Sequence, residues 1–187
     1  MKTKIAVIVG STRNNSYSQR LANNLVEFFP EDYQTEFIKI SHLPLYNQDY
    51  DTADTPAEYG DFRDKIRSFD AVVFVTPEHN RSFSAALKNA LDIGSRPYSK
   101  NVWDGKPALI VSQSPGNISG FGANHQLRQV LTFVNMPVLQ QPEAYIAHTN
   151  KLFDEDGKII KEGTVEFLQT VIDAFVELIE RYVATGE

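Results

Sequence analysis

Residues 4–22, KIAVIVGSTRNNSYSQRLA, decide the fold of this chain. The apolar run at residues 5–9 stops at Gly10, a polar turn follows, and an apolar helical pattern starts at Leu21. This order predicts a buried strand, a turn and the beginning of a helix. Such a strand–turn–helix unit is the building block of a parallel sheet covered by helices.

The turn in this segment carries hydroxyl and amide side chains and one guanidinium, but no acidic residue. Backbone N–H groups at the start of a helix lack partners, and the helix dipole favours an anion there. Arg13 can grip phosphate oxygens with its forked guanidinium, and Ser11, Ser16 and Ser18 can donate to the others. The turn therefore predicts a phosphate site; the alternative is a capped turn with polar surface residues.

The composition bounds the class of protein. With 187 residues, 42% hydrophobic and 22% charged, the chain fits a single domain spanning residues 1–187. The formal net charge of -6 argues against nucleic acid or an anionic membrane as the main partner. The absence of cysteine excludes disulfides, thiolate metal sites and a thiol nucleophile. No apolar run resembles a signal peptide or a membrane span, so we expect a cytoplasmic enzyme or binding protein.

Strands and helices alternate along the rest of the chain. The expected strands are residues 4–10, 35–40, 71–75, 108–111 and one within 138–146. The expected helices are about residues 18–29, 57–68, 83–91, 127–134 and 165–179. The first and third strands are continuously apolar and the second alternates, which favours the strand order 2-1-3-4-5 with the second strand at an edge. The prediction is an α/β three-layer sandwich, a five-stranded parallel sheet with helices on both faces.

Three polar turns lie at one edge of this predicted sheet, because the carboxyl ends of parallel strands meet there. Besides residues 11–18, these are residues 77–82, which offer flat groups and backbone amides, and residues 112–122, which begin with small side chains. A phosphate site beside a flat surface describes a mononucleotide site. Flavin mononucleotide (FMN) suits this topology best.

Other phosphate-binding folds do not fit the first turn. A P-loop needs a lysine after its glycines, and no lysine follows Gly10 in this turn. A dinucleotide fold needs further glycines after the first strand and an acidic residue at the end of the second, and neither is present. A phospho-accepting receiver needs an aspartate at the end of the third strand, where this chain has Val75 and Thr76.

Several motifs in register make the chain resemble the NADPH-dependent FMN reductase family, which is flavodoxin-like and includes quinone, azo-dye and chromate reductases. These motifs are GSTR at residues 10–13 with Ser16 and Ser18, PEHNRS at 77–82, LKNALD at 87–92, SRP at 95–97, LRQVL at 127–131 and KLFDEDG at 151–157. The similarity runs nearly end to end.

The resemblance implies a set of cofactor-binding residues. The FMN phosphate would be held by Ser11, Arg13, Ser16 and Ser18. The ribityl chain and ring would be bordered by Pro77, Glu78, His79, Asn80 and Ser82. The other side would be closed by Ser112, Gln113, Ser114 and Gly116.

The chain departs from the family pattern on the ring side. His79 replaces a usual Tyr, Ser84 and Ala85 replace a common Pro-Gly, and Ile93 replaces a common Trp. Residues 119–122, SGFG, replace a Gly-Gly-Ala-Arg-like run. These departures concern the acceptor and the NADPH contacts rather than phosphate binding.

The resemblance also implies the reaction. Hydride would pass from NADPH or NADH through bound FMN to a small acceptor (quinone, azo compound, chromate or flavin) by a ping-pong mechanism. FMN carries this chemistry, so it requires no catalytic side chain and no metal. The resemblance further implies a homodimer or homotetramer. Two alternatives stay open: a non-catalytic flavodoxin-like FMN electron carrier, and an interaction domain without a cofactor.

Two more side chains carry structural predictions. Glu78 is expected to cap a helix or pair with a basic neighbour such as Lys88 or Arg96, and not to act as an acid. Trp103, the lone tryptophan, is expected to pack in its loop.

Overall fold

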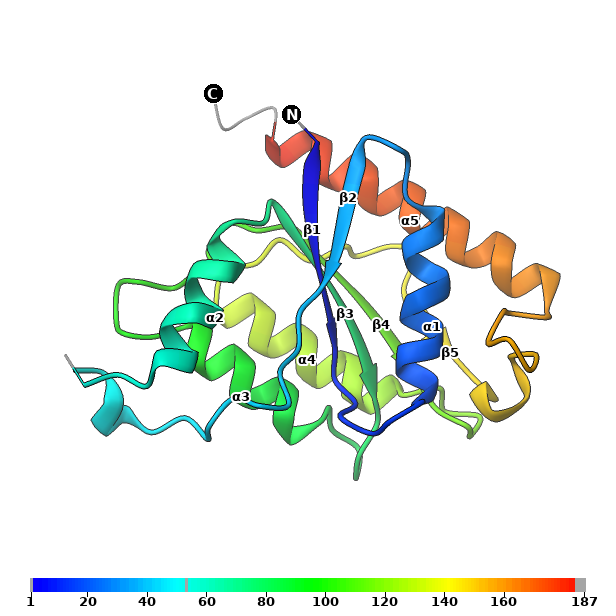
Figure 1. Cartoon of the computed structure of the whole chain (residues 1–187). Helices are drawn as coiled ribbons and strands as arrows, with labels where there is room; N and C mark the ends of the chain where they lie inside the picture. Colours follow the sequence, from blue (N-terminus) through cyan, green and yellow to red (C-terminus); the bar gives the residue numbers. More distant parts are fainter. Residues whose placement is uncertain (1, 53, 184–187) are drawn as a thin grey trace.

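The computed structural model describes residues 2–52 and 54–183. Its sheet has five parallel strands in the order β2-β1-β3-β4-β5, which confirms the predicted topology and the flavodoxin-like sandwich (Figure 1). The strands are β1 Thr3–Val9, β2 Tyr33–Phe37, β3 Ala71–Pro77, β4 Ala108–Gln113 and β5 Ala144–Ile146. The chain leaves β1 toward β2 on one side and returns to β3 on the other, so the switch point lies between β1 and β3.

Helices cover both faces of the sheet. The α-helices are α1 Tyr17–Leu25, α2 Ala57–Arg67, α3 Ala85–Gly94, α4 Phe121–Phe133 and α5 Glu162–Val183. The short 3-10 helices are η1 Val26–Phe28, η2 Gln48–Tyr50 and η3 Thr149–Lys151. Buried side chains of α1 and α5 share one core with the sheet, and those of α2, α3 and α4 share the other (Figure 1).

Strand β1 shows why the sequences of the central strands are apolar at every position. Successive side chains of a strand point to opposite faces of the sheet. Ile5 and Val7 accordingly lie in the core beside α1 and α5, whereas Ala6 and Ile8 lie in the core beside α2, α3 and α4. A strand covered by helices on both faces needs apolar residues at every position.

Some element boundaries differ from the predicted ones. β3 and β4 each run two residues further, to Pro77 and Gln113, which brings the polar turns closer to the sheet edge. β2 spans Tyr33–Phe37 instead of 35–40, although it does form an edge strand. α4 begins at Phe121, six residues before the apolar pattern that predicted it; the pattern missed this part because, apart from the half-exposed Phe121, residues 122–126 are polar or small.

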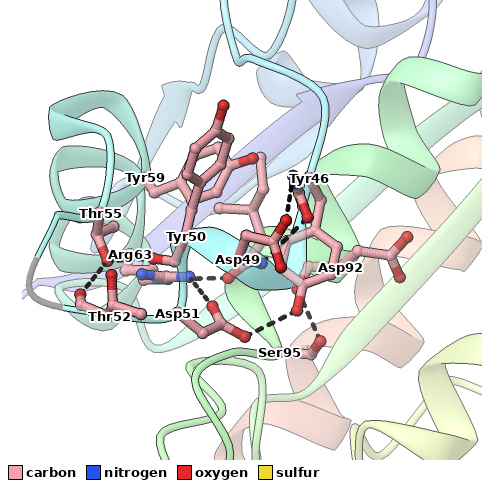
Figure 2. Close-up of polar contacts among 12 residues, drawn as sticks. Tyr46, Asp49, Tyr50, Asp51, Thr52, Thr55, Tyr59, Arg63, Asp92 and Ser95 are labelled. Carbon is pink, nitrogen blue, oxygen red and sulfur yellow. Dashed lines mark hydrogen bonds and ion pairs between the residues drawn. The ribbon is translucent and has the colours of Figure 1, made fainter.

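The long loop between β2 and α2 is held by a polar network around Arg63 (Figure 2). The guanidinium of Arg63 donates from Nε to the Ile93 carbonyl at 2.9 Å and lies 3.5 Å from the Asp51 carboxylate. Tyr46 donates its hydroxyl to the same carboxylate at 2.8 Å. Burial lowers the pKa of Arg63, and the charge of Asp51 acts in the opposite direction. The side chains of Arg63 and Asp51 are only 6% and 12% exposed, so each needs the opposite charge of the other to offset the cost of its burial.

Trp103 lies in the core and not merely in its own loop. Its indole is fully buried, and Nε1 donates to the Leu91 carbonyl at 3.0 Å. The ring covers Gly94 so closely that a Cβ at this glycine would lie 2.4 Å from Nε1. The tryptophan therefore fixes the carboxyl end of α3 against the sheet.

The edge strand β5 contacts α4 through an aromatic cluster. The Tyr145 hydroxyl lies 3.1 Å from His125 Nε2, and the two rings stack with their centroids 6.2 Å apart. Burial raises the pKa of Tyr145 to about 12, and Glu143 adds to the rise. The folded protein thus favours the protonated phenol.

This shift predicts an alkaline loss of stability. The unfolded tyrosine ionises near its ordinary pKa of 10.0 and the folded one near about 12, so the unfolded state binds fewer protons between these values. The Tyr145 contribution is complete below pH 10 and declines as pH rises toward 12. Urea unfolding across this range should show a shallower decline for Tyr145→Phe than for the parent, whereas Tyr98→Phe, 86% exposed, should match the parent. If the free energy of unfolding declined equally with pH in the parent and both variants, the assignment of the effect to Tyr145 would be contradicted.

Candidate functional site

The carboxyl ends of β1, β3 and β4 surround a cavity of about 490 Å³. All three polar turns contribute to it, as the sheet order requires. Its lining consists of residues 10–13, 16, 17, 77–79, 84–86 and 113–115. The cavity is therefore the crevice expected at the topological switch point.

The first turn leads into the amino end of α1. Ser16 is the N-cap, and its hydroxyl accepts from the Gln19 N–H at 3.1 Å. The N–H groups of Tyr17 and Ser18 are too close to the helix start to have an intrahelical acceptor. The exposed Arg13 packs its guanidinium over the Tyr17 ring, 5.5 Å from the ring centroid. Donors and positive charge thus gather at one end of the cavity, which suits an anion.

The glycine at the end of β1 brings three elements together. The Gly10 N–H donates to the Val75 carbonyl at 2.8 Å, and the Gly10 carbonyl accepts from the Ser84 hydroxyl. A Cβ at this position would lie 3.2–3.3 Å from Ser84, Pro77 and Thr76. The close approach lets the first turn and the start of α3 share one cavity wall.

Ser84 is a cavity residue outside the predicted set. Besides its bond to Gly10, it caps α3 by accepting from the Leu87 N–H at 3.2 Å. A serine just before the apolar helical pattern is a recognisable N-cap signal, so the sequence could have placed it here. The lining outside that set also includes Thr12, Tyr17, Ala85, Ala86 and Pro115.

The predicted site residues divide into two groups. Those in the cavity lining are Ser11, Arg13, Ser16, Pro77, Glu78, His79, Gln113 and Ser114. Those outside the lining are Ser18, Asn80, Ser82, Ser112 and Gly116. The second group belongs to the same turns but has other partners or lies beyond the cavity rim.

Ser18 lies behind the cavity wall. Its side chain is fully buried, and its hydroxyl accepts from Gln113 Nε2 at 2.9 Å. Gln113 Oε1 in turn accepts from the Thr149 hydroxyl at 2.6 Å. The helix repeat places Ser18 on the same inward face as Leu21 and Ala22, so its hydroxyl orients Gln113 instead of facing the cavity.

Ser112 is also fully buried and outside the lining. Its hydroxyl donates to the Ser119 carbonyl at 3.2 Å and accepts from Asn124 Nδ2 at 3.4 Å. Both contacts lie beneath the third turn. The side chain supports that turn from below, while the next strand residue, Gln113, is in the lining.

The second turn reverses sharply after His79. The His79 N–H donates to the Ser82 carbonyl at 2.8 Å, and the Ser82 N–H donates to the His79 carbonyl at 2.9 Å. Asn80 and Arg81 occupy the tip with φ values of 50° and 71°. The tip projects beyond the cavity, which is why Asn80 does not line it.

The carboxylate of Glu78 is directed toward α4. It accepts from the Ala123 N–H at 3.2 Å and lies 3.4 Å from Arg81 Nη1. The predicted capping role is therefore confirmed, but the basic partner is Arg81 and not Lys88, which pairs with Asp92 at 2.7 Å.

The lining as a whole fits a phosphorylated flavin. Arg13 and the start of α1 offer positive charge and N–H donors for a phosphate. Glu78 is the only acidic residue of the lining, and its carboxylate is occupied elsewhere. Ala85, Ala86 and Pro115 leave an uncharged surface for a flat ring.

Residues 2–52 and 54–183 contain neither a metal-binding cluster nor a membrane-spanning helix. Within these ranges, no group of three or more His, Asp or Glu side chains is arranged to hold a metal ion. No helix among the described residues combines the length and the apolar character needed to cross a membrane. The fold is that of a flavodoxin-like protein, with a crevice at the topological switch point of its sheet.

Known proteins agree with this class. Residues 3–151 match the NADPH-dependent FMN reductase family. A quinone reductase from Pseudomonas putida is 48% identical over 94% of each chain. A 2-hydroxy-1,4-benzoquinone reductase from a Burkholderia species is 42% identical over 94% of this chain and 95% of the relative. FerB, a flavoenzyme NAD(P)H:(acceptor) oxidoreductase from Paracoccus denitrificans, has a solved structure with a TM-score of 0.90 and 38% identity, covering 96% of this chain and 98% of that one.

The chain belongs to the NADPH-dependent FMN reductase family. This membership confirms the predicted oxidoreductase class with FMN as its cofactor. It favours an enzyme over both alternatives, the passive electron carrier and the interaction domain without a cofactor.

Proposed function

We propose that this chain is a cytoplasmic NAD(P)H:quinone oxidoreductase that works through bound FMN. The observation that carries the proposal is the single cavity lined by all three turns, which combines Arg13 beside the start of α1 with the uncharged Ala85, Ala86 and Pro115. The relative from Pseudomonas putida, 48% identical, is named a quinone reductase, which supports a quinone as the acceptor.

In this proposal the first turn holds the phosphate. Arg13 would bind two phosphate oxygens, and the N–H groups at the start of α1 would bind the others, with the hydroxyls of Ser11 and Ser16 beside them. Ser18 and Gln113 would act from behind, through the 2.9 Å hydrogen bond that holds the glutamine in the wall.

The second and third turns would enclose the flavin ring. Pro77 and His79 lie in the lining from one turn, and Ser114 and Pro115 from the other. When bound, FMN would supply a ring that accepts hydride from the nucleotide and passes it on to the acceptor. Because one cavity serves both half-reactions, NAD(P)H and the acceptor would occupy the same place in turn, which supports a ping-pong mechanism.

The proposal includes a homodimer or homotetramer. Phe133 on α4 is 89% exposed, and Tyr98 after α3 is 86% exposed. Both border a groove of about 750 Å³ between these helices. Large exposed apolar side chains beside a groove are typical of surfaces that associate, which supports contact between copies of the chain.

The decisive test is an anaerobic titration of FMN-loaded protein with NADPH and with NADH. We expect the purified protein to take up FMN, the flavin absorbance to bleach on adding either nucleotide, and a benzoquinone to restore it. Parallel additions of an azo dye and of chromate should restore the absorbance more slowly than the quinone.

Each contrary result has a specific meaning. Protein that fails to take up FMN would contradict the cofactor site. Bound flavin that NADPH and NADH leave oxidised would show an electron carrier. Faster reoxidation by azo dye or chromate than by the quinone would contradict the acceptor class.

A further inference from the structure

We propose that Glu78 and Gly122 form a brace that fixes the second turn against the start of α4 and so sets the width of the crevice for the flavin ring. Both are positioning residues, because they act through the backbone that lines the cavity. The inference rests on the proposed FMN site.

The second turn needs support from outside. Asn80 and Arg81 both have left-handed backbone conformations, with φ values of 50° and 71°, which side-chain-bearing residues adopt at a cost. The reciprocal pair of bonds between His79 and Ser82 closes the turn on itself, and the 3.4 Å contact between Arg81 Nη1 and the Glu78 carboxylate spans it. A strained turn of this kind keeps its shape when its surroundings hold it.

Glu78 supplies one half of this support. The N-cap of α4 is Gly120, which has no side chain to accept from the first helical N–H groups. Glu78 reaches across from the second turn and accepts from the Ala123 N–H at 3.2 Å. A carboxylate at a helix start also interacts favourably with the helix dipole. The side chain of Glu78 is only 12% exposed, so this bond is shielded from water.

Gly122 supplies the other half. A Cβ at this glycine would lie 2.7 Å from the Arg81 carbonyl oxygen and 3.1 Å from Glu78 Oε2. Its φ does not lie in the left-handed region, so close approach is what favours glycine here. The backbone at the tip of the second turn thus rests directly on the first turn of α4.

This contact joins two walls of one cavity. The second turn contributes Pro77 and His79 to the lining, and the third turn, which leads into α4, contributes Ser114 and Pro115. If the second turn moves relative to the start of α4, the spacing between these walls changes. A planar ring bound between them would respond to that spacing, whereas a phosphate bound at α1 would not.

Riboflavin, which lacks the phosphate, separates these two parts of the site. We expect Glu78→Ala to weaken FMN and riboflavin by the same factor of about tenfold, the lower end of what one hydrogen bond to a charged group is worth. Gly122→Ala should also weaken both flavins alike, because its methyl group would displace the Arg81 carbonyl. Glu78→Gln should stay within about threefold of the parent for both flavins, because its amide oxygen can still accept from the Ala123 N–H. Fluorescence titration of the apoprotein measures each dissociation constant.

Matched controls separate the brace from general destabilisation. Gly60→Ala adds a methyl group on α2 with no atom within 4 Å of it, and Glu36→Ala removes an exposed carboxylate that pairs with Lys65. Both should bind the flavins like the parent. Circular dichroism and the melting temperature identify any variant that fails to fold. If Gly122→Ala fails to fold, the difference in flavin affinity between Glu78→Ala and Glu78→Gln still tests the brace.

Three outcomes would overturn the brace. The first is parent-like flavin binding in folded Glu78→Ala and Gly122→Ala. The second is an equal loss in Glu78→Gln and Glu78→Ala, which would assign the effect to charge. The third is a loss confined to FMN. A parent protein that binds neither flavin would instead refute the proposed function.

Discussion

Arg13→Ala should weaken FMN binding by about 10- to 150-fold while leaving riboflavin binding within about twofold of the parent. A hydrogen bond to a charged group is worth about 1.5–3 kcal/mol, and the phosphate is the part of FMN that Arg13 would contact. The residue lines the cavity beside the start of α1, and its guanidinium has a ring contact with Tyr17 that it could exchange for the phosphate. Fluorescence titration of the apoprotein with each flavin provides the measurement.

Two further variants sharpen this prediction. Arg13→Lys keeps the charge but loses the forked geometry, so its affinity should lie between those of the parent and the alanine variant. Arg20→Ala removes a similar charge from α1, but Arg20 is not in the lining and should leave FMN binding unchanged. An unaltered FMN dissociation constant in Arg13→Ala would refute the phosphate role.

Asp51→Asn should reduce the free energy of unfolding by about 3 kcal/mol, the lower part of the range for breaking a buried ion pair. The change removes the negative charge that compensates the buried Arg63 guanidinium, whose bond to the Ile93 carbonyl and contact with the Tyr59 ring are both uncharged. For a domain of this length, the melting temperature should fall by about 6–12 °C. Urea and thermal unfolding measure both quantities.

An exposed pair provides the control. Asp64→Asn removes a partner of Arg67 on the surface of α2, where the exposed fractions are 46% and 78%. Surface pairs contribute about 0–1 kcal/mol, so this variant should unfold like the parent. If Asp51→Asn and Asp64→Asn reduced the free energy of unfolding equally, burial of the Asp51–Arg63 pair would not account for its contribution to stability. Replacing both Asp51 and Arg63 with apolar residues should cost less than Asp51→Asn, since no charge is then left uncompensated.

The sheet can be predicted from sequence because its strands differ in how they are covered. Residues 5–9 and 71–75 are apolar at every position, which is required of strands with helices on both faces, and residues 35–37 are not. The start of α4 is harder to predict. Phe121 is half exposed and contacts His125 on the same helix, so the first turns lack the periodic apolar face that signals a helix.

The site is predictable to the level of the turns and less so to the level of side chains. Arg13 and Ser16 precede α1, where the turn directs them to the cavity. Ser18 is on the first turn of the helix, three and four residues before the buried Leu21 and Ala22, so helical periodicity could have placed it inward. Glu78's bond to Ala123 joins residues 45 positions apart, and no local pattern reveals it.

Gln113 donates one buried hydrogen bond to Ser18 and accepts another from Thr149, and the two bonds connect α1, β4 and η3, three separate segments of the chain. Because they hold the cavity wall in place before anything binds, little conformational entropy remains to be lost when a ligand enters. Such preorganisation favours tight binding at a given number of contacts. In the proposed function, it would also make release of the cofactor slow relative to that of the nucleotides and acceptors that would enter the same crevice.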